Sequence, residues 1–424
     1  MVKVPLYAKA LAGAGIGILV GAACGTRPIV AGIGTQELGA LGMVVIRLLK
    51  ALATPLIFFA VVDAVVRIRI PRRKGFALLA VSGVNAAVAI AIGVGVARLI
   101  HAGNGSFATV LAHSQASGGA PQALAPSRHT DWLAGMPENV IDPFRSNSVI
   151  SVVLLALAVG FATRHVLERG GEDERDARVL GAGIRAALQA CTRLLEWAVQ
   201  AVPIAVLCAI AGLVGKSGLG VFSSLGAFLG TMLLGLALHA VVYYSLLLYA
   251  LGGRSPLVFW RGAADAVVTA LSCGSSLVTL PVTLRCLKGL GVTTSSSRLA
   301  ACIGTNLNHD GIVLYEAAAT LFVAQALHLE LSLSAQLAVA MAAVLAGVGM
   351  PGVPEAGLVT MPLVFAAAGI PDAIAPVVLP LVLPVDWLIG RCRAAVNVTS
   401  DMVVATLLDR IVPEPNSEIA NDHP

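Results

Sequence analysis

Long apolar stretches separated by short polar segments run along the chain. A helix needs about 20 mainly apolar residues to cross a hydrocarbon core of about 30 Å. Eight stretches approach or exceed that length, near residues 8–25, 41–66, 75–102, 147–165, 183–214, 219–251, 299–327 and 373–409. The pattern therefore predicts an all-α integral membrane protein with eight transmembrane helices.

Two further apolar stretches are interrupted. Residues 255–290 contain Ser275, Ser276 and Pro281, and residues 331–370 contain a Gly- and Pro-rich segment at 349–354. Non-helical backbone at membrane depth is tolerated only where it is buried in protein or lines a watered cavity, and broken helices form the binding sites of many secondary transporters. We expect two re-entrant helical hairpins at a binding site. A kinked structural helix is the alternative.

Basic residues test the topology, because Lys and Arg concentrate in short cytoplasmic loops. They cluster before the first stretch, between the second and third, between the fourth and fifth, around the segment 255–290 and after the last stretch. All these clusters fall on one side if both interrupted stretches return to the side from which they enter. We expect both termini in the cytoplasm, an external loop at 103–146, and a location in the cell membrane, as a bacterial inner-membrane protein.

The composition agrees with a membrane protein. Of 424 residues, 57% are hydrophobic and 12% are charged, and the mean hydropathy is +0.88. The net charge of +5 resides in the short loops, so it indicates orientation and not nucleic-acid binding. The seven cysteines are scattered without a C-x-x-C pair and predict neither a disulfide framework nor a zinc site.

The first apolar stretch has a second interpretation. Lys3 precedes it and Cys24 ends it, which resembles a secretory or lipoprotein leader. We favour a transmembrane helix, because Gly21 stands where a lipoprotein leader needs leucine and another long apolar stretch follows.

The last stretch combines charges with an amide. Asp386, Arg393, Asn397 and Asp401 are separated by seven, four and four residues. On a helix they share one stripe of roughly 80°, and intramembrane charges normally face a cavity or a partner. A guanidinium suits capture of a carboxylate, while amide and carboxylate oxygens suit a hard cation. The alternative is an internal ion pair that only holds helices together.

A second polar cluster, at 304–311, interrupts the seventh stretch. It reads Gly-Thr-Asn-Leu-Asn-His-Asp-Gly, a poor sequence for a helix. If it unwinds, its carbonyls and the oxygens of Asn308 and Asp310 would suit an alkali cation. A purely structural helix break is the alternative.

Four ordered motifs resemble the dicarboxylate/amino acid:cation symporters, the glutamate transporter family. Residues 275–286 are similar to its first hairpin, with a serine-rich tip followed by TLPVT, and 308–311 to its NMDGT motif. Residues 352–357 are similar to its second hairpin tip, and 386–399 to its last helix. The resemblance is weaker in the N-terminal half but spans nearly the whole chain.

This resemblance implies a homotrimer in the lipid bilayer with an elevator mechanism. Scaffold helices would occupy 1–74 and 147–217. The transport domain would comprise 75–102 and 218–409, with a cytoplasmic tail at 410–424. The second hairpin would be the gate.

The resemblance also implies the ligands. A small carboxylate substrate would contact Ser275, Ser276, Val353, Gly357, Gly390, Arg393 and Asn397. One sodium ion would be held by Gly304, Asn308, Asn397 and Asp401, and a second by Asn308 and Asp310. A third would use backbone carbonyls near Asn306 and at 347–350.

Several departures from the family pattern concern the substrate. Gly390 stands where carriers of acidic amino acids place the aspartate that binds the substrate's amino group. Ala394 and Ile312 each replace a threonine, whereas Arg393 is kept. These residues favour an acidic substrate without a required ammonium group, such as a C4 dicarboxylate, over aspartate or glutamate. A neighbouring carboxylate such as Glu355 is the alternative partner for an amino group.

Other departures concern the coupling ions. Ser82, Asn85 and Ala86 replace the family's sodium-binding residues in the third stretch, which places one sodium site in doubt. His309 replaces the methionine of NMDGT, which leaves proton coupling open beside a buried neutral histidine. Arg391 has no clear partner, with Asp386 and Glu355 as the candidates.

The sequence thus predicts a secondary active symporter for a small acidic organic substrate, with Na⁺ as a coupling ion, H⁺ left open and no organic cofactor. A carrier of a neutral amino acid, or an uncoupled channel or substrate sensor, is the alternative on the same scaffold. An enzyme is not expected, because neither H-E-x-x-H nor G-x-S-x-G occurs.

Overall fold

The computed structural model describes residues 6–25, 27–30, 33–67, 72–101, 103, 139–146, 149–169, 172–219, 221–350, 356–371 and 373–413. These residues are mainly helical. A short antiparallel ribbon of β1 (Pro28–Val30) and β2 (Ile33–Gly34) is the exception within these ranges. Most of the expected loop at 103–146, and the segment 351–355 with Val353 and Glu355, lie outside the described residues.

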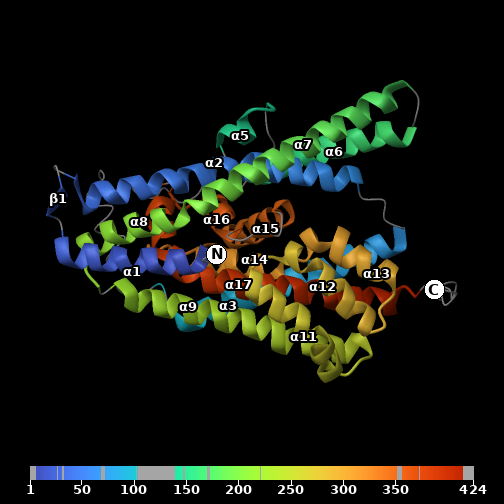
Figure 1. Cartoon of the computed structure of the whole chain (residues 1–424). Helices are drawn as coiled ribbons and strands as arrows, with labels where there is room; N and C mark the ends of the chain where they lie inside the picture. The colour runs from blue at the N-terminus through green and yellow to red at the C-terminus, as the bar shows by residue number, and fades with distance from the viewer. Residues whose placement is uncertain are drawn as a thin grey trace, which may run out of the picture.

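Five helices of the N-terminal half form one packed group, shown in blue and green in Figure 1. They are α1 (Leu6–Cys24), α2 (Thr35–Arg67), α6 (Val149–Arg169), α7 (Glu172–Gln200) and α8 (Val202–Ser217). The short helix α5 (Asp142–Ser146) precedes α6. α2 contacts α6, α7 and α8, and α8 packs along α1.

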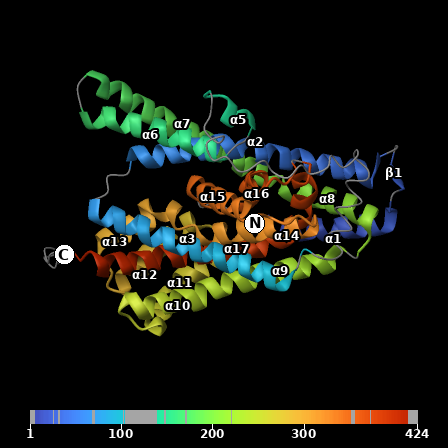
Figure 2. The same cartoon turned by 180° about the vertical axis from the view of Figure 1, so that it is seen from behind.

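The remaining elements form a second group around a long final helix, α17 (Ala375–Ile411). α3 (Arg72–Ile100) leaves its neighbours in sequence and packs against α9 (Val221–Ala237), α14 (Asp310–Ala326) and α17, as the view from behind shows (Figure 2). α9 continues through the π-helix η2 (Leu238–Tyr243), α10 (Tyr244–Leu247) and the π-helix η3 (Leu248–Gly252). The assignment of the two groups to a scaffold and a moving domain stays a prediction.

The first interrupted stretch folds back on itself. α11 (Pro256–Cys273) ends at Gly274, whose φ of +66° is left-handed, and α12 (Ser276–Gly289) starts directly afterwards. The side chain of Ser275 accepts the N–H of Val278 at 3.4 Å and so caps α12. The turn therefore lies at 274–275, and Pro281 sits inside α12 without ending it.

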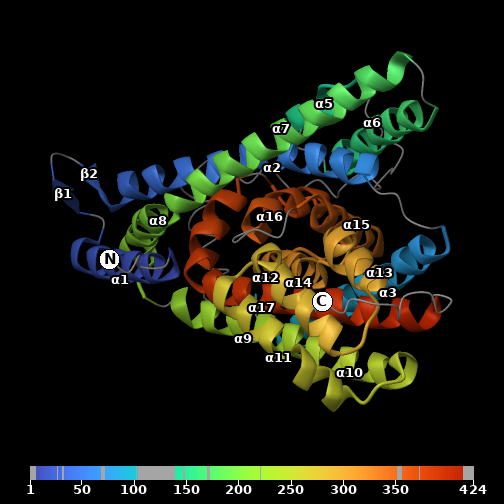
Figure 3. The same ribbon diagram turned by 45° about the vertical axis from the view of Figure 1, so that its right-hand side comes forward.

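The second interrupted stretch consists of α15 (Leu333–Gly349) and α16 (Ala356–Ala367), which pack against each other. Figure 3 shows both lying between α2 and the inner helices α14 and α17. They therefore lie where the second group of helices packs against α2 and α6 of the first.

The seventh stretch is broken as its composition suggests. α13 (Thr294–Arg298) leads into the π-helix η4 (Leu299–Ile303) and the 3₁₀ turn η5 (Thr305–Leu307), and α14 begins only after His309. Non-helical backbone at Asn308 and His309 marks the break.

One prediction was wrong in detail. The stretch 183–214, expected as one helix, is divided between α7 and α8, which meet at a bend of 44°. Pro203 lies in the first turn of α8, where its missing N–H is tolerated, so the helix restarts there.

By length and apolar composition, three described helices are able to cross a membrane, at Arg73–Ile100, Ser151–Arg169 and Leu225–Gly252, and the bent pair α7–α8 makes up to four. α17, with 37 residues, is long enough but carries charged residues through its middle. The count of eight spans stays a prediction.

Close packing of α1 on α8 depends on glycines spaced four apart. A Cβ on Gly13 would lie 2.5 Å from the carbonyl oxygen of Pro203, and one on Gly17 would lie 2.6 Å from that of Leu207. A Cβ on Gly21 would approach the Cβ of Val214 to 2.7 Å. Small residues at this spacing let membrane helices approach closely.

We expect Gly17→Ala to lower the melting temperature of the purified protein, because the added methyl group forces α8 away from α1. Overpacking of this kind costs about 1–3 kcal/mol. Gly15→Ala is the matched control, since a Cβ there meets nothing within 4 Å. Equal melting temperatures for the two variants would contradict the close contact.

Candidate functional site

The polar stripe of the last helix faces the protein interior. The side chains of Asp386, Arg393, Asn397 and Asp401 are at most 4% exposed. α17 packs on α11, α12, α14 and α16, so its inner face meets both interrupted stretches and the helix that follows the break.

Arg393 lies where three helices meet. Its Nη2 donates to Asp386 Oδ2 at 3.2 Å, and its Cζ lies 4.2 Å from the ring centroid of Tyr315 on α14. A Cβ on Gly357 of α16 would lie 1.5 Å from Arg393 Nη1, so a side chain at this position would displace the guanidinium from where it lies. The buried guanidinium is thus held by an ion pair and a cation–π contact.

Gly390 adjoins the same ion pair. A Cβ there would lie 3.2 Å from Arg393 Nη2 and 3.9 Å from Asp386 Oδ2. A carboxylate side chain at this position would therefore approach both charged groups. Its absence leaves Asp386 as the acid paired with Arg393.

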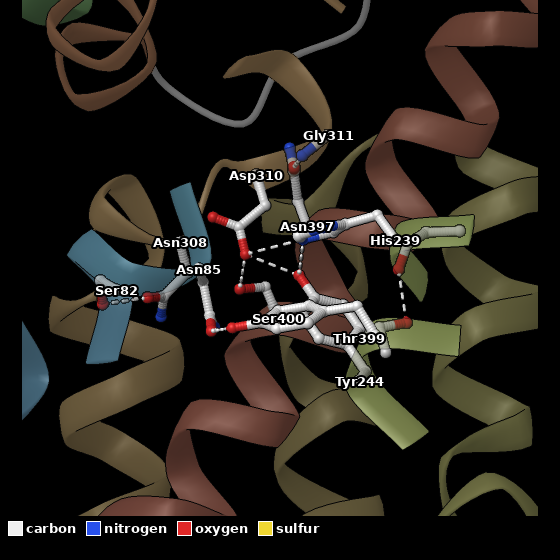
Figure 4. Close-up of polar contacts among 12 residues, drawn as sticks. Ser82, Asn85, His239, Tyr244, Asn308, Asp310, Gly311, Asn397, Thr399 and Ser400 are labelled. Carbon is white, nitrogen blue, oxygen red and sulfur yellow. Dashed lines mark hydrogen bonds and ion pairs between the residues drawn. The ribbon is translucent and has the colours of Figure 1, made fainter. Parts of the chain in front are cut away.

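Asp401 is held by neutral donors. Asn308 Nδ2 donates to its Oδ1 and Thr305 Oγ1 to its Oδ2, each at 3.0 Å. Ser82 of α3 donates to Asn308 Oδ1 at 2.6 Å (Figure 4). The broken segment, α3 and α17 therefore converge on one buried carboxylate.

Asp310, the first residue of α14, lies in a separate network. Tyr244 and Ser400 donate to its Oδ2 at 2.6 and 2.7 Å (Figure 4). His239 Nε2 lies 3.1 Å from the hydroxyl of Tyr244 and 3.5 Å from Asp310 Oδ2. The Oδ1 atom is buried without a hydrogen-bond partner among the described residues.

Asn397 links the two halves of the site. Its Oδ1 accepts the backbone N–H of Gly311 at 2.9 Å (Figure 4), and a Cβ on Gly311 would lie 2.7 Å from the carbonyl oxygen of Arg393. Asn397 therefore fixes the start of α14 against α17, one helical turn or about 6 Å from Arg393 and from Asp401.

The other predicted residues are placed as follows. Ser275 caps α12, and Ser276 is buried with no hydrogen-bond partner for its Oγ in the described part of the chain. Gly304 begins the η5 turn, and of Asn306 only the backbone is described. Val353 lies outside the described residues.

Arg391 points away from this site. Its Nη1 donates to the carbonyl of Leu271 at 2.8 Å and also to that of Ser272. These carbonyls end α11, so Arg391 ties α17 to the first hairpin just before its turn. Asp386, one of its two candidate partners, pairs instead with Arg393.

Five residues of the buried site were not predicted as site residues from the sequence. Tyr315 and Glu316 lie on α14, and Thr360 of α16 donates a hydrogen bond to Glu316 Oε1. His239 and Tyr244 lie in and just after a π-helix. A lone histidine within an apolar stretch was a usable signal, because intramembrane ionisable groups are rare unless they function.

The donor set suits an alkali cation. Among the described residues, no three His, Cys, Asp or Glu side chains come together as a metal site. Carboxylate, amide and hydroxyl oxygens gather at Asp401 and Asp310, and the partnerless Asp310 Oδ1 can accept a cation.

Comparison with known proteins decides the family. Residues 6–411 match the model of the sodium:dicarboxylate symporter family. The chain belongs to this family. This match confirms the resemblance of the four motifs to that family.

Curated relatives of this symporter family include excitatory amino acid transporters. The chain is 32% identical over 266 residues to excitatory amino acid transporter 3 of Bos taurus, covering 62% of this chain and 49% of that protein. It is 31% identical over 289 residues to transporter 1 of Homo sapiens, covering 67% and 50%. It is 33% identical over 277 residues to transporter 4 of Mus musculus, covering 65% and 48%. The matches thus span about half of each relative.

Tyr244→Phe should destabilise the protein, because it removes a donor from the buried Asp310 carboxylate. Hydrogen bonds to charged groups contribute about 1.5–3 kcal/mol. Thermal unfolding of the purified protein measures the loss. The control is Tyr249→Phe, whose side chain is 78% exposed. If both variants melt alike, the Tyr244–Asp310 bond does not stabilise the fold.

Proposed function

We propose that this chain is a secondary active symporter that moves a small acidic organic substrate with sodium. Arg393 binds a substrate carboxylate, assisted by Asn397 and by the hairpin positions Ser275, Ser276, Val353, Gly357 and Gly390. Asp401 binds a sodium ion with Asn308, Asn397 and the backbone at Gly304. Asp310 is the centre of a second cation site.

One observation carries this proposal: α17 buries a cationic group and an uncompensated anionic group on the same face. Arg393 has the ion pair with Asp386, whereas the described partners of Asp401 are Asn308 and Thr305, which are neutral. A buried carboxylate without an opposite charge costs several kcal/mol. A bound sodium ion would supply that charge.

The spacing of the two groups supports coupling between substrate and ion. Arg393 and Asp401 are eight residues apart, which is about 12 Å along a helix. At an effective dielectric constant of about 20, a substrate anion and a sodium ion at that distance attract by about 1.4 kcal/mol, or about tenfold in affinity. Each ligand therefore strengthens the other, as reciprocal linkage requires.

The surroundings of Arg393 favour a dicarboxylate over an amino acid. Gly390 offers no carboxylate to an ammonium group, and Asp386 is engaged with Arg393. The relatives are excitatory amino acid transporters, which points instead to an amino acid substrate. An uptake assay in proteoliposomes distinguishes these substrates and coupling ions. It is run with a sodium gradient and then with a proton gradient, for labelled succinate, fumarate, malate, aspartate, glutamate and serine. Accumulation of the labelled substrate above its equilibrium concentration identifies a symporter, because a channel only equilibrates the substrate.

The second hairpin, α15–α16, is the proposed gate. Gly357 of α16 contacts the Arg393 guanidinium, so a substrate bound there would touch this hairpin directly. A homotrimer whose inner helices move together against α1, α2, α6, α7 and α8 completes the proposal.

Arg393→Lys should lower substrate uptake about 10- to 100-fold, because lysine keeps the charge but loses the planar fork that binds a carboxylate. Initial uptake rates at low substrate concentration measure the effect. Arg391→Lys is the control on the same helix, since lysine can still donate to the carbonyls of Leu271 and Ser272. Equal loss in both variants would remove the special role of Arg393.

Asp401→Asn should raise the sodium concentration for half-maximal uptake about tenfold or more, because the amide lacks the charge that attracts the ion. Asp265→Asn provides the control, since the Asp265 side chain is 77% exposed. An unchanged sodium dependence in Asp401→Asn would place the sodium ion elsewhere.

A further inference from the structure

The end of α15 is tied to the broken seventh stretch by one side chain. The last carbonyls of a helix lack donors from the helix itself. Here the carbonyl oxygen of Gly347 lies 2.7 Å from His309 Nδ1 and also accepts the N–H of Met350 at 3.3 Å. The gate hairpin and the segment that carries Asn308 and Asp310 are thus directly connected.

The chemistry of the contact defines the state of the histidine ring. A carbonyl oxygen only accepts, so the hydrogen must reside on Nδ1 of His309. The ring is 1% exposed, and its Nε2 has no hydrogen-bond partner among the described residues. The bond to Gly347 therefore orients the imidazole.

Residue 347 leaves room for this contact. A Cβ on Gly347 would lie 3.1 Å from Val313 Cγ2 and 3.5 Å from the Cβ of His309. The absence of a side chain lets α15 lie close to the start of α14. The contact therefore depends on both residues, because Gly347 allows the close approach and His309 supplies the hydrogen-bond donor.

A cation does not fit at this oxygen. A carbonyl oxygen has two lone pairs, and both are engaged by N–H donors from His309 and Met350. The Nδ1–H group also directs the positive end of its dipole toward the position where a cation would bind. A sodium ion held by the carbonyls at 347–350, which the family resemblance implies, would have to displace His309.

We propose that His309 takes the place of a cation at the end of α15, so that this chain binds no sodium ion at the Gly347 carbonyl. The Nδ1–H group of His309, and not a bound ion, holds the end of α15 through the carbonyl oxygen of Gly347. This inference rests on the proposed symport only for its consequence, that fewer sodium ions accompany each substrate than the three that the resemblance implies.

The protonated nitrogen of the His309 ring and its hydrogen bond can be tested without a transport assay. The full-length protein, labelled with ¹⁵N-histidine and placed in lipid nanodiscs, is examined by ¹⁵N NMR without sodium and at saturating sodium, with His309→Gln assigning the signal. We expect the hydrogen-bonded Nδ1–H of His309 in both conditions. Loss of this hydrogen bond when sodium is added overturns the proposal, while leaving symport itself untouched.

Counting bound sodium gives the second test. His309→Met frees one lone pair of the Gly347 carbonyl, and we expect about one additional sodium ion per chain in equilibrium binding. His309→Gln keeps an N–H donor and should bind as many ions as the wild type. His165→Met on the exposed side of α6 is the matched control. An unchanged count in His309→Met refutes the replacement.

Discussion

The burial of charge inside a helical core is the constraint on which this architecture depends. Asp310, Asp386, Arg393 and Asp401 are almost completely buried, and each charge would cost several kcal/mol if it were left without compensation. Arg393 and Asp386 compensate each other, and Asp310 receives donors from Tyr244 and Ser400. The hydrogen-bond donors to Asp401, Asn308 and Thr305, are neutral as well, so a mobile ion could balance the charge of Asp310 or of Asp401.

The breaks in the helices serve the same constraint. The break in the seventh stretch releases backbone groups from regular helical hydrogen bonds, and the side chains of Thr305 and Asn308 beside it both donate to Asp401. The π-helix around His239 likewise changes the direction of the side chains that reach Asp310. Irregular backbone is therefore concentrated where polar groups must converge, and the regular helices supply the apolar enclosure.

The apolar pattern predicted the helices well because long apolar stretches and Gly–Ser breaks are strong local signals. It failed at 183–214, where the restart of the helix at Pro203 was overlooked. Contacts between distant segments were harder. The roles of His239 and Tyr244 depend on π-helical geometry, and Arg391 binds backbone carbonyls, which carry no sequence signature. The stripe from Asp386 to Asp401 was visible because helical spacing alone defines it.

A fixed donor and a mobile ion have different consequences for coupling. A ligand shifts a conformational equilibrium only by its difference in affinity between the two states. The bond from His309 to Gly347 holds α15 against the start of α14 whether sodium is present or absent. It therefore stabilises this arrangement, but it does not couple the arrangement to sodium binding. Under the proposed symport, the energy of the gradient would therefore enter through the carboxylates of Asp310 and Asp401, and the hairpin would respond to a substrate beside Gly357.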